Sequence, residues 1–524
     1  MSFQKSLSLY GVLATSLSCM IGSGWLFASF ISMQYAGPAA IISWIIGGFL
    51  IILIALTYAE IGAMLPVEGG IARYAQLTYG SSTSFIISWF AWISSGSAAP
   101  SEVQATIIYL SQYFSDLSIT KGLEPMLTTK GTIISYLLLL IFTVINLYGI
   151  KIVSYFNNSM ALWKVMIPLL ISLVIGGSQL HFENFYLYGG FAPHGIKGIL
   201  MAVSTTIVFS YLGFREITSL GSEIQNPQKT MPYAVVGSVL FAMLFYVLIQ
   251  GLFIISLPAE YLNNSWTLDK INYSSPVLDL SIILGLSWIS SLIYLDSMIT
   301  PSGTALIYIT TSSRLNYAIS KNVQAPRFLG DLNSYDVPYK SIITNYIIGC
   351  FLLGFFPSWQ LLVKFQTTAI ILAYTIGPLS LIAFRQLYPN LKRPFKLPQY
   401  QLLSFLAFYS CTLLIYWTGW EVISLMSIVL MIGVAFFMSF RLYTNQTLPD
   451  LHFSSCIWII YYILGLTIIS FFGSYGGNNL IELGYDLLLL LLHSFITQSI
   501  SNKSMLSIYQ SKEQSKLCHS PVNA

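Results

Sequence analysis

Long apolar runs, separated by short polar segments, fill most of this chain. A membrane-spanning helix needs about 20 mostly apolar residues, because each residue adds about 1.5 Å across about 30 Å of hydrocarbon. The runs predict 12–14 spanning helices, near 7–33, 39–64, 83–113, 132–149, 155–176, 196–221, 232–256, 279–312, 341–356, 361–384, 402–419, 422–441, 456–473 and 485–500. The last run is short, and its leucine-rich part (487–492) could instead lie in the membrane interface.

The composition agrees with a chain that is surrounded mainly by lipid. Of the 524 residues, 55% are hydrophobic and only 8% are charged, whereas a soluble domain carries about 25% charged residues. This difference excludes a soluble enzyme. The net charge of +4 is too small for a nucleic-acid-binding surface.

Motifs that would indicate a cofactor or a metal are missing from the sequence. The five cysteines form no CxxC pair, the five histidines form no HExxH motif, and no complete phosphate-binding loop is present. We therefore expect no enzymatic activity, no cofactor and no metal site. Any work that the protein does would be driven by gradients across the membrane.

Positive charges predict the orientation of the spans. With the N-terminus in the cytoplasm, the loops on that side hold 16 lysines and arginines, and the outer loops hold 5. Cytoplasmic loops of membrane proteins carry such an excess. An even number of spans places both termini in the cytoplasm, with a serine-rich tail at 501–524. We expect the membrane to be a bacterial inner membrane.

Two of the predicted spans are interrupted near mid-membrane. The first contains Gly22-Ser23-Gly24, and the sixth contains Gly213, Arg215 and Glu216. Freed backbone groups cost several kcal/mol in hydrocarbon unless they are buried in protein or face a watery cavity. Breaks at matching positions of two halves indicate a secondary transporter. The N–H groups and positive dipole end of a half-helix suit a carboxylate, and unwound carbonyls suit an ammonium group.

An alternative is that Gly22 and Gly24 form a small-residue surface for helix packing. Their spacing lacks the four-residue period of that motif, and the second break is left unexplained. The transporter interpretation is therefore favoured.

Several motifs resemble those of the amino acid–polyamine–organocation transporter superfamily over about residues 7–400. The resemblance implies a LeuT-like, all-α membrane fold of two inverted five-helix repeats, with discontinuous helices 1 and 6 and alternating access to a central site. The repeats would occupy 1–176 and 196–400, and about four additional helices would fill 401–500. The motifs are the first-span segment 21–27, the second-span ending 58–66 with Gly69-Gly70, and the sixth-span signature with Gly213-Phe214, Asn226-Pro227 and Pro232.

Within the superfamily, the chain looks most like the bacterial aspartate–proton symporter-type permeases. That branch has Gly-Phe-Arg, Ser-Pro-Phe and Pro-Ser-Gly-Thr segments, where this chain has residues 213–215, 275–277 and 301–304. The additional C-terminal spans of this chain also suit that branch. The resemblance therefore implies a proton-coupled symporter, with an acidic amino acid as the leading substrate.

Six ionisable residues fall within the predicted spans. Each costs about 2.5–3.5 kcal/mol at a helix centre on insertion scales, so they should face the interior of the bundle, paired or hydrated. Four are acids and two are bases, so one acid could carry the proton that is coupled to transport. The six are Glu60, Glu102, Lys164, Arg215, Glu216 and Asp296.

Lys164 lies in the middle of the fifth span. In proton-coupled relatives, a lysine at this place stands near the first helix, where sodium-coupled relatives bind a cation. The resemblance therefore implies that deprotonation of Lys164 is linked to transport, and burial in general makes a lysine easier to deprotonate. The alternative is a permanent ion pair with a neighbouring carboxylate.

Arg215 follows the second break, at a place where many relatives have an acidic residue. A guanidinium group beside the central site could bind the side-chain carboxylate of a substrate with two hydrogen bonds, which would favour aspartate or glutamate. Arg215 could instead pair with Glu102 or Asp296 and leave a pocket for neutral substrates.

The acids Glu102, Glu216 and Asp296 are further candidates for proton coupling, although a structural role is the simpler interpretation of each. Glu216 could cap the second half-helix near its positive end. Glu60 is expected to be structural because it lies near the cytoplasmic end of its span. Ser302 could contribute a hydroxyl group to the site.

We expect an amino acid to bind between the two breaks. Its carboxylate would meet N–H groups at 22–24, and its amine would meet carbonyls around Phe209 and Ser210, with Phe209 and Phe214 as gates. Rival interpretations are an exchanger of amino acids or their amine products, a neutral amino acid permease and, more remotely, a channel or a nutrient sensor. The oligomeric state is open, with a monomer expected. The predicted substrate-binding residues are Ile21, Gly22, Ser23, Gly24, Phe209, Ser210, Tyr211, Gly213, Phe214 and Arg215.

Overall fold

The computed structural model describes residues 8–67, 69–121, 124–148, 150–219, 221, 224–268, 270–322, 324–443 and 453–506. At 150–159, 219 and 453 it describes the backbone alone. The helices are α1 (Leu9–Met20), α2 (Gly24–Ala36), α3 (Ala40–Met64), α4 (Gly70–Leu110), α5 (Thr129–Leu147), α6 (Ile150–Ser178), α7 (Gly195–Ala202), α8 (Val208–Ser210), α9 (Glu216–Ser219), α10 (Pro227–Ile255), α11 (Pro276–Ile283), α12 (Ser287–Lys321), α13 (Tyr339–Phe355), α14 (Trp359–Tyr374), α15 (Ile376–Leu387), α16 (Tyr400–Tyr416), α17 (Trp420–Tyr443), α18 (Ile457–Phe472) and α19 (Tyr485–Leu506).

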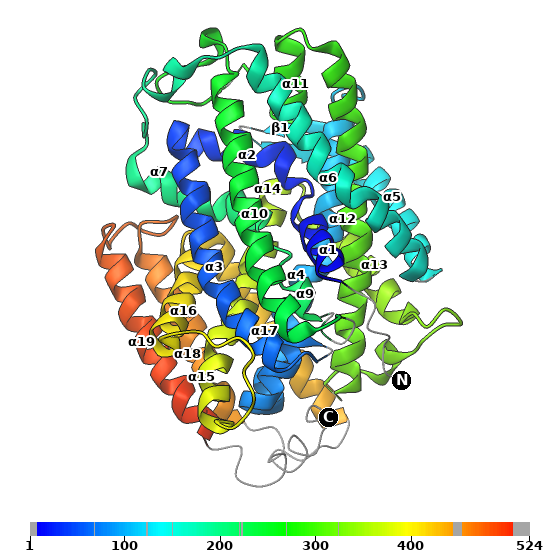
Figure 1. Ribbon diagram of the computed structural model, residues 1–524, viewed down its shortest axis with the longest axis vertical. Coiled ribbons are helices and arrows are strands. Elements are labelled where there is room, and N and C mark those ends of the chain that lie inside the picture. The colour runs from blue at the N-terminus through cyan, green and yellow to red at the C-terminus, as the bar shows by residue number, and fades with distance from the viewer. Residues whose placement is uncertain are drawn as a thin grey trace.

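The helices pack side by side, and most of the long ones follow the long axis of the molecule (Figure 1). Eight stretches of the described chain are long and apolar enough to cross a membrane. The expected all-α, multi-pass membrane protein is therefore confirmed. The α3 helix packs against α10, and α4 packs against both α12 and α14. A π-helical turn, η3 (Val203–Ile207), joins α7 to α8, and the antiparallel strands β1 (Ser118–Lys121) and β2 (Glu124–Leu127) lie between α4 and α5.

Three elements differ from the expected apolar runs. The α4 helix begins well before residue 83, because a more polar segment joins it through a kink at Gly80, whose φ is 81°. The run at 279–312 is divided between α11 and α12 next to Gly285, whose φ of 70° is left-handed. The run at 361–384 is divided between α14 and α15. Hydrophobicity alone does not mark such breaks, because the residues on both sides are similarly apolar.

The last helix, α19, packs against α16 and α18 and lies beside α18 in Figure 1. Gly465 permits a close approach, because a Cβ there would lie 2.2 Å from Cε1 of His493. The leucine-rich segment 487–492 therefore belongs to the packed bundle. The first part of the expected tail, 501–506, continues α19 as helix. Its remainder, 507–524, lies outside the described residues.

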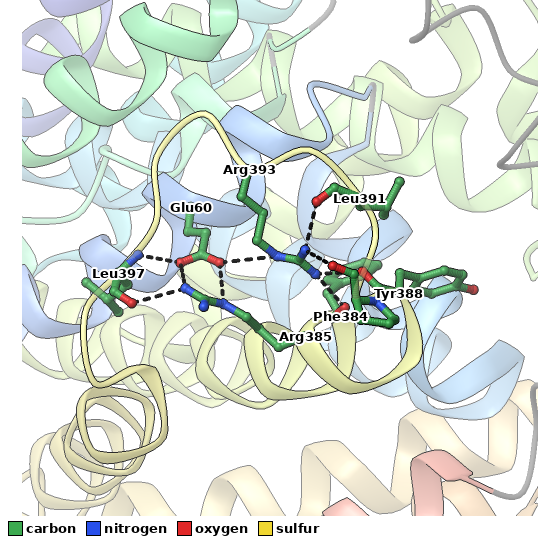
Figure 2. A network of polar contacts seen from close by, with 8 residues as sticks. Glu60, Phe384, Arg385, Tyr388, Leu391, Arg393 and Leu397 are labelled. Carbon is green, nitrogen blue, oxygen red and sulfur yellow. Dashed lines mark hydrogen bonds and ion pairs between the residues drawn. The ribbon is translucent and has the colours of Figure 1, made fainter.

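A buried cluster of charges joins the end of α3 to α15 and to the segment before α16 (Figure 2). Arg385 donates to both carboxylate oxygens of the fully buried Glu60, from Nε at 2.8 Å and from Nη2 at 2.7 Å. The N–H of Leu397 donates to the same carboxylate at 2.7 Å. Arg393 lies 3.7 Å from Glu60 and donates to carbonyls at the C-terminal end of α15. These contacts support the structural role expected for Glu60.

We expect Glu60→Ala to lower the free energy of unfolding by about 3–5 kcal/mol, because it leaves the Arg385 guanidinium buried without a counter-charge. The unfolding temperature of the purified protein in detergent measures this effect. Glu421→Ala is the matched control, because it removes an exposed acid at the start of α17. Equal unfolding temperatures for the two variants would contradict the structural role.

Candidate functional site

The first break separates α1 from α2 and frees backbone carbonyls, which accept hydrogen bonds from side chains of other helices. The Lys164 ammonium group, on α6, donates to the carbonyl of Ser18 at 2.7 Å and to Oγ1 of Thr304 at 2.6 Å. Oγ1 of Thr304, on α12, lies 3.3 Å from the carbonyl oxygens of both Ser18 and Ile21. The carbonyl end of a helix carries partial negative charge, which favours a cation at this place.

Lys164 is fully buried and lies beside the first break, as the resemblance implies. Both oxygens that accept its hydrogen bonds are uncharged, so the alternative of an ion pair is not realised among the described residues. Gly303 makes room for the lysine, because a Cβ there would lie 3.0 Å from Lys164 Cε. The hydroxyl group that contacts the break comes from Thr304, and not from Ser302 as expected.

Glu102, on α4, lies at the N-terminal end of α2. The N–H of Ser23 donates to Oε2 of Glu102 at 2.7 Å, and Glu102 is only 2% exposed. Gly22 is required for this approach, because a Cβ at residue 22 would lie 2.6 Å from Glu102 Oε1. Free N–H groups and the positive dipole end of a helix stabilise an anion. A carboxylate of the protein itself therefore fills the place that the sequence suggested for the substrate carboxylate.

The second break lies between α8 and α9 and contacts the first. Gly213 has a φ of 123°, and a Cβ there would lie 2.9 Å from the Cβ of Cys19 at the end of α1. A Cβ at Gly24 would lie 2.6 Å from Oγ of Ser210, the last residue of α8. Both contacts need glycine, because any side chain would push the breaks apart. The structure thus brings the two predicted binding segments together.

Arg215 is buried at the end of the second break, immediately before α9. Its Nη2 forms a short ion pair with Glu216 and donates to Oγ of Ser95, on α4, at 2.9 Å. The partner is therefore Glu216, and not Glu102 or Asp296. The Arg215 Nε–H is buried and has no hydrogen-bond partner among the described residues, so the guanidinium group keeps one donor for another acceptor.

Glu216 is the first residue of α9, where an acid suits the positive helix end, and it also neutralises the neighbouring guanidinium. Asp296 is fully buried on α12. Its Oδ1 accepts from Trp163 Nε1 at 2.7 Å and from Thr300 Oγ1 at 2.6 Å. Its Oδ2 forms no hydrogen bond of normal geometry within the described part of the chain, and the indole group of Trp25 is its polar neighbour. Of these two acids, Asp296 is thus the one without a cation bonded to it there.

Two aromatic residues next to the second break, Phe209 and Phe214, pack against opposite ends of α14. Phe209 packs edge-on against Trp359 at the start of α14, with ring centroids 5.8 Å apart. Phe214 packs against Tyr374 at its other end, with centroids 5.0 Å apart. Tyr211 donates its hydroxyl group to a carbonyl of α3 and packs there. The positions of the two phenylalanines suit gates on two sides of the breaks.

Three residues of this arrangement were not predicted from the sequence: Ser95, Thr304 and Trp359. Ser95 precedes Glu102 by seven residues, which is about two helical turns, so this spacing could have revealed that both lie on one face of α4. Thr304 is the last residue of the segment 301–304, which was already one of the motifs that carry the resemblance. Trp359 gives no local signal, because it reaches the site from a distant part of the chain.

Comparisons with known proteins identify the family of the chain. The family model described as "Amino acid permease" matches residues 7–464. The chain is 33% identical to the glutamate/serine transporter AimA of Bacillus subtilis, over 94% of this chain and 92% of that protein. It is also 33% identical to the aspartate–proton symporter of the same organism, over 94% of this chain and 95% of that one. The expected superfamily is therefore confirmed, and the chain belongs to the amino acid permease family.

Proposed function

We propose that this permease takes up acidic amino acids together with protons. The observation that carries the proposal is the Glu102 carboxylate at the N-terminus of α2, bonded to the N–H of Ser23. This place binds a carboxylate, and every amino acid substrate carries one. A substrate that binds here by its own carboxylate must displace Glu102.

The displacement couples substrate binding to a proton. A carboxylate that leaves its N–H donor inside a buried site is costly unless it finds a new partner or becomes neutral. Glu102 therefore takes up a proton when the substrate carboxylate replaces it. When the substrate leaves on the other side of the membrane, Glu102 binds the α2 terminus again and releases the proton there.

Lys164 supplies a positive charge beside the first break. Its ammonium group holds the carbonyl end of α1 while Glu102 or the substrate holds the N–H end of α2. Loss of the lysine proton would free α1 from α6 and α12, which makes Lys164 the second candidate for the coupling step. Asp296 is a third, because it is fully buried and forms no ion pair among the described residues. Glu216 is the least suited, because it is paired with Arg215.

We expect Lys164→Gln to reduce proton-driven uptake at least tenfold, because hydrogen bonds from a charged group are worth about 1.5–3 kcal/mol. Uptake of labelled aspartate by purified protein in liposomes measures this. Lys197→Gln, which removes an exposed lysine near the start of α7, is the control and should transport normally. Normal proton-driven uptake by Lys164→Gln would remove the lysine from the coupling step.

Arg215 supports the acidic substrate class. Its guanidinium group adjoins the second break, and its Nε–H has no partner within the described residues. The names of the two relatives at 33% identity include aspartate and glutamate. A side-chain carboxylate that reached Arg215 would share it with Glu216 and fill the open donor position.

A second candidate is a permease or exchanger for neutral amino acids. The ion pair of Arg215 with Glu216 favours it, because the pair already neutralises the guanidinium group. For either candidate we place the protein in the inner membrane, as a monomer with both termini in the cytoplasm.

Uptake of labelled L-aspartate into liposomes, with and without an inward proton gradient, tests the proposal. Asparagine and glutamine are matched competitors, because they have nearly the shape of aspartate and glutamate without the side-chain charge. We expect gradient-stimulated uptake that glutamate inhibits and asparagine does not. Inhibition by asparagine as strong as by glutamate would overturn the acidic substrate class, and exchange that ignores the gradient would overturn the symport.

A further inference from the structure

Trp359 links the start of α14 to the first break. It is the first residue of that helix and is 1% exposed. Its indole Nε1–H donates to Oγ of Ser23 at 3.3 Å. Its ring packs against Phe27 of α2, with centroids 4.5 Å apart, and against Phe209 before the second break. A single side chain thus contacts both interrupted helices.

The contact with Ser23 continues to Glu102. The N–H of Ser23 donates to Oε2 of Glu102 at 2.7 Å, so the residue that accepts from the indole group also holds the carboxylate. A hydroxyl group has one hydrogen and two acceptor lone pairs. When Ser23 Oγ accepts from the indole of Trp359, its hydrogen remains available for the Glu102 carboxylate. Ser23 thus connects Trp359 to Glu102, through its hydroxyl group on one side and its N–H on the other.

The position of Trp359 is fixed independently of Ser23. The N–H of Leu127, in β2, donates to the carbonyl of Pro357 at 3.0 Å. Ser358 caps α14 by accepting from the N–H of Leu361, and its hydroxyl group donates to Glu124 of β2. The hairpin thus anchors the residues that precede Trp359, so the indole group meets Ser23 from a supported position.

We propose that Trp359 is a positioning residue for Glu102, which acts through the hydroxyl group of Ser23 and stabilises the carboxylate at the N-terminus of α2. The inference rests on the proposed function, because it concerns the carboxylate that the substrate displaces. Removing the indole N–H should therefore weaken the interaction of the Glu102 carboxylate with the N-terminus of α2. The substrate then displaces Glu102 more easily, and Glu102 accepts its proton at a higher pH.

The other charged and titratable groups around Glu102 are not altered by a change at residue 359. They come from four elements packed around the site, and they remain the same in every variant compared below. Lys164 on α6 and Tyr246 on α10 interact with Glu102 itself, and Asp296 on α12 and Cys19 on α1 interact with Lys164.

Trp359→Phe tests the inference, because it keeps an aromatic ring for Phe27 and Phe209 and removes the N–H donor together with part of the indole ring. One neutral hydrogen bond corresponds to about a threefold to tenfold change in an equilibrium. We expect the KM for aspartate in counterflow to fall about threefold, and the pH at half-maximal uptake to rise by about 0.5. Trp266→Phe is the matched control, because it removes a buried indole hydrogen bond to Tyr188 in another part of the protein. It should change neither quantity.

Ser23→Ala provides a second, independent test, because it removes the same link from the other end. In the Ser23→Ala protein, Trp359→Phe should have no further effect on KM or on the pH profile. An unchanged KM and pH profile of Trp359→Phe, or additive effects in the double variant, would overturn the role of Trp359. If Glu102→Gln also left proton dependence intact, the proposed coupling itself would be wrong, so the two failures are distinguishable.

Discussion

Glu102→Gln should abolish proton-driven accumulation of aspartate and preserve aspartate exchange. The glutamine carbonyl can still accept from the N–H of Ser23, so the geometry at the start of α2 is kept. The amide cannot take up a proton, so substrate binding is no longer linked to one. Each unit of pH gradient corresponds to about 1.4 kcal/mol per proton, and the variant should lose the roughly tenfold accumulation that each unit provides.

The counterflow KM of this variant is the second readout. In the natural protein, the substrate competes with an ionised Glu102, so KM should rise with pH by up to about tenfold per unit. In Glu102→Gln, KM should be low and independent of pH. Asp296→Asn is the matched control, because it neutralises another fully buried acid. Proton-driven accumulation by Glu102→Gln, together with its loss in Asp296→Asn, would move the coupling proton to Asp296.

Replacing Arg215 and Glu216 together by glutamine should change the substrate class. The double variant removes both members of the ion pair, so neither charge is left buried alone. Hydrogen bonds to a charged group are worth about 1.5–3 kcal/mol, so we expect aspartate uptake to fall roughly tenfold to a hundredfold relative to asparagine uptake. Competition assays in the same liposomes measure the ratio.

Arg215→Lys is the control for charge alone, because it keeps a positive group and loses the planar pair of donors. We expect it to keep a preference for acidic substrates with weaker binding. An unchanged ratio of aspartate to asparagine uptake in the double variant would show that the ion pair is only structural. The neutral amino acid permease would then be the better description.

The sequence was most informative where the backbone itself is unusual. The glycines at 22, 24 and 213 were recognised as breaks, and the structure explains each by a contact that a Cβ would prevent. Their meaning could be derived locally, because a glycine in mid-membrane is costly unless something needs the space. The alternation of apolar runs likewise predicted an all-α membrane bundle, which the helices confirm.

The partners of the buried charges could not be derived in the same way. Arg215 pairs with its own neighbour, Glu216, whereas the partners expected from the sequence, Glu102 and Asp296, lie on other helices. Glu102 lies at the N-terminus of α2, 79 residues away along the chain. Which charge meets which helix end depends on how the helices pack, and the apolar faces that decide the packing look alike in sequence.

Counting the protons taken up during substrate binding tests the proposed coupling through Glu102 most directly. Purified protein in a weakly buffered detergent solution would be mixed with saturating L-aspartate, and a pH-indicator dye would record the protons taken up. We expect about one proton per bound aspartate for the natural protein at a pH where Glu102 is ionised, and none for Glu102→Gln. Aspartate binding without proton uptake in the natural protein, or equal uptake in both proteins, would contradict it.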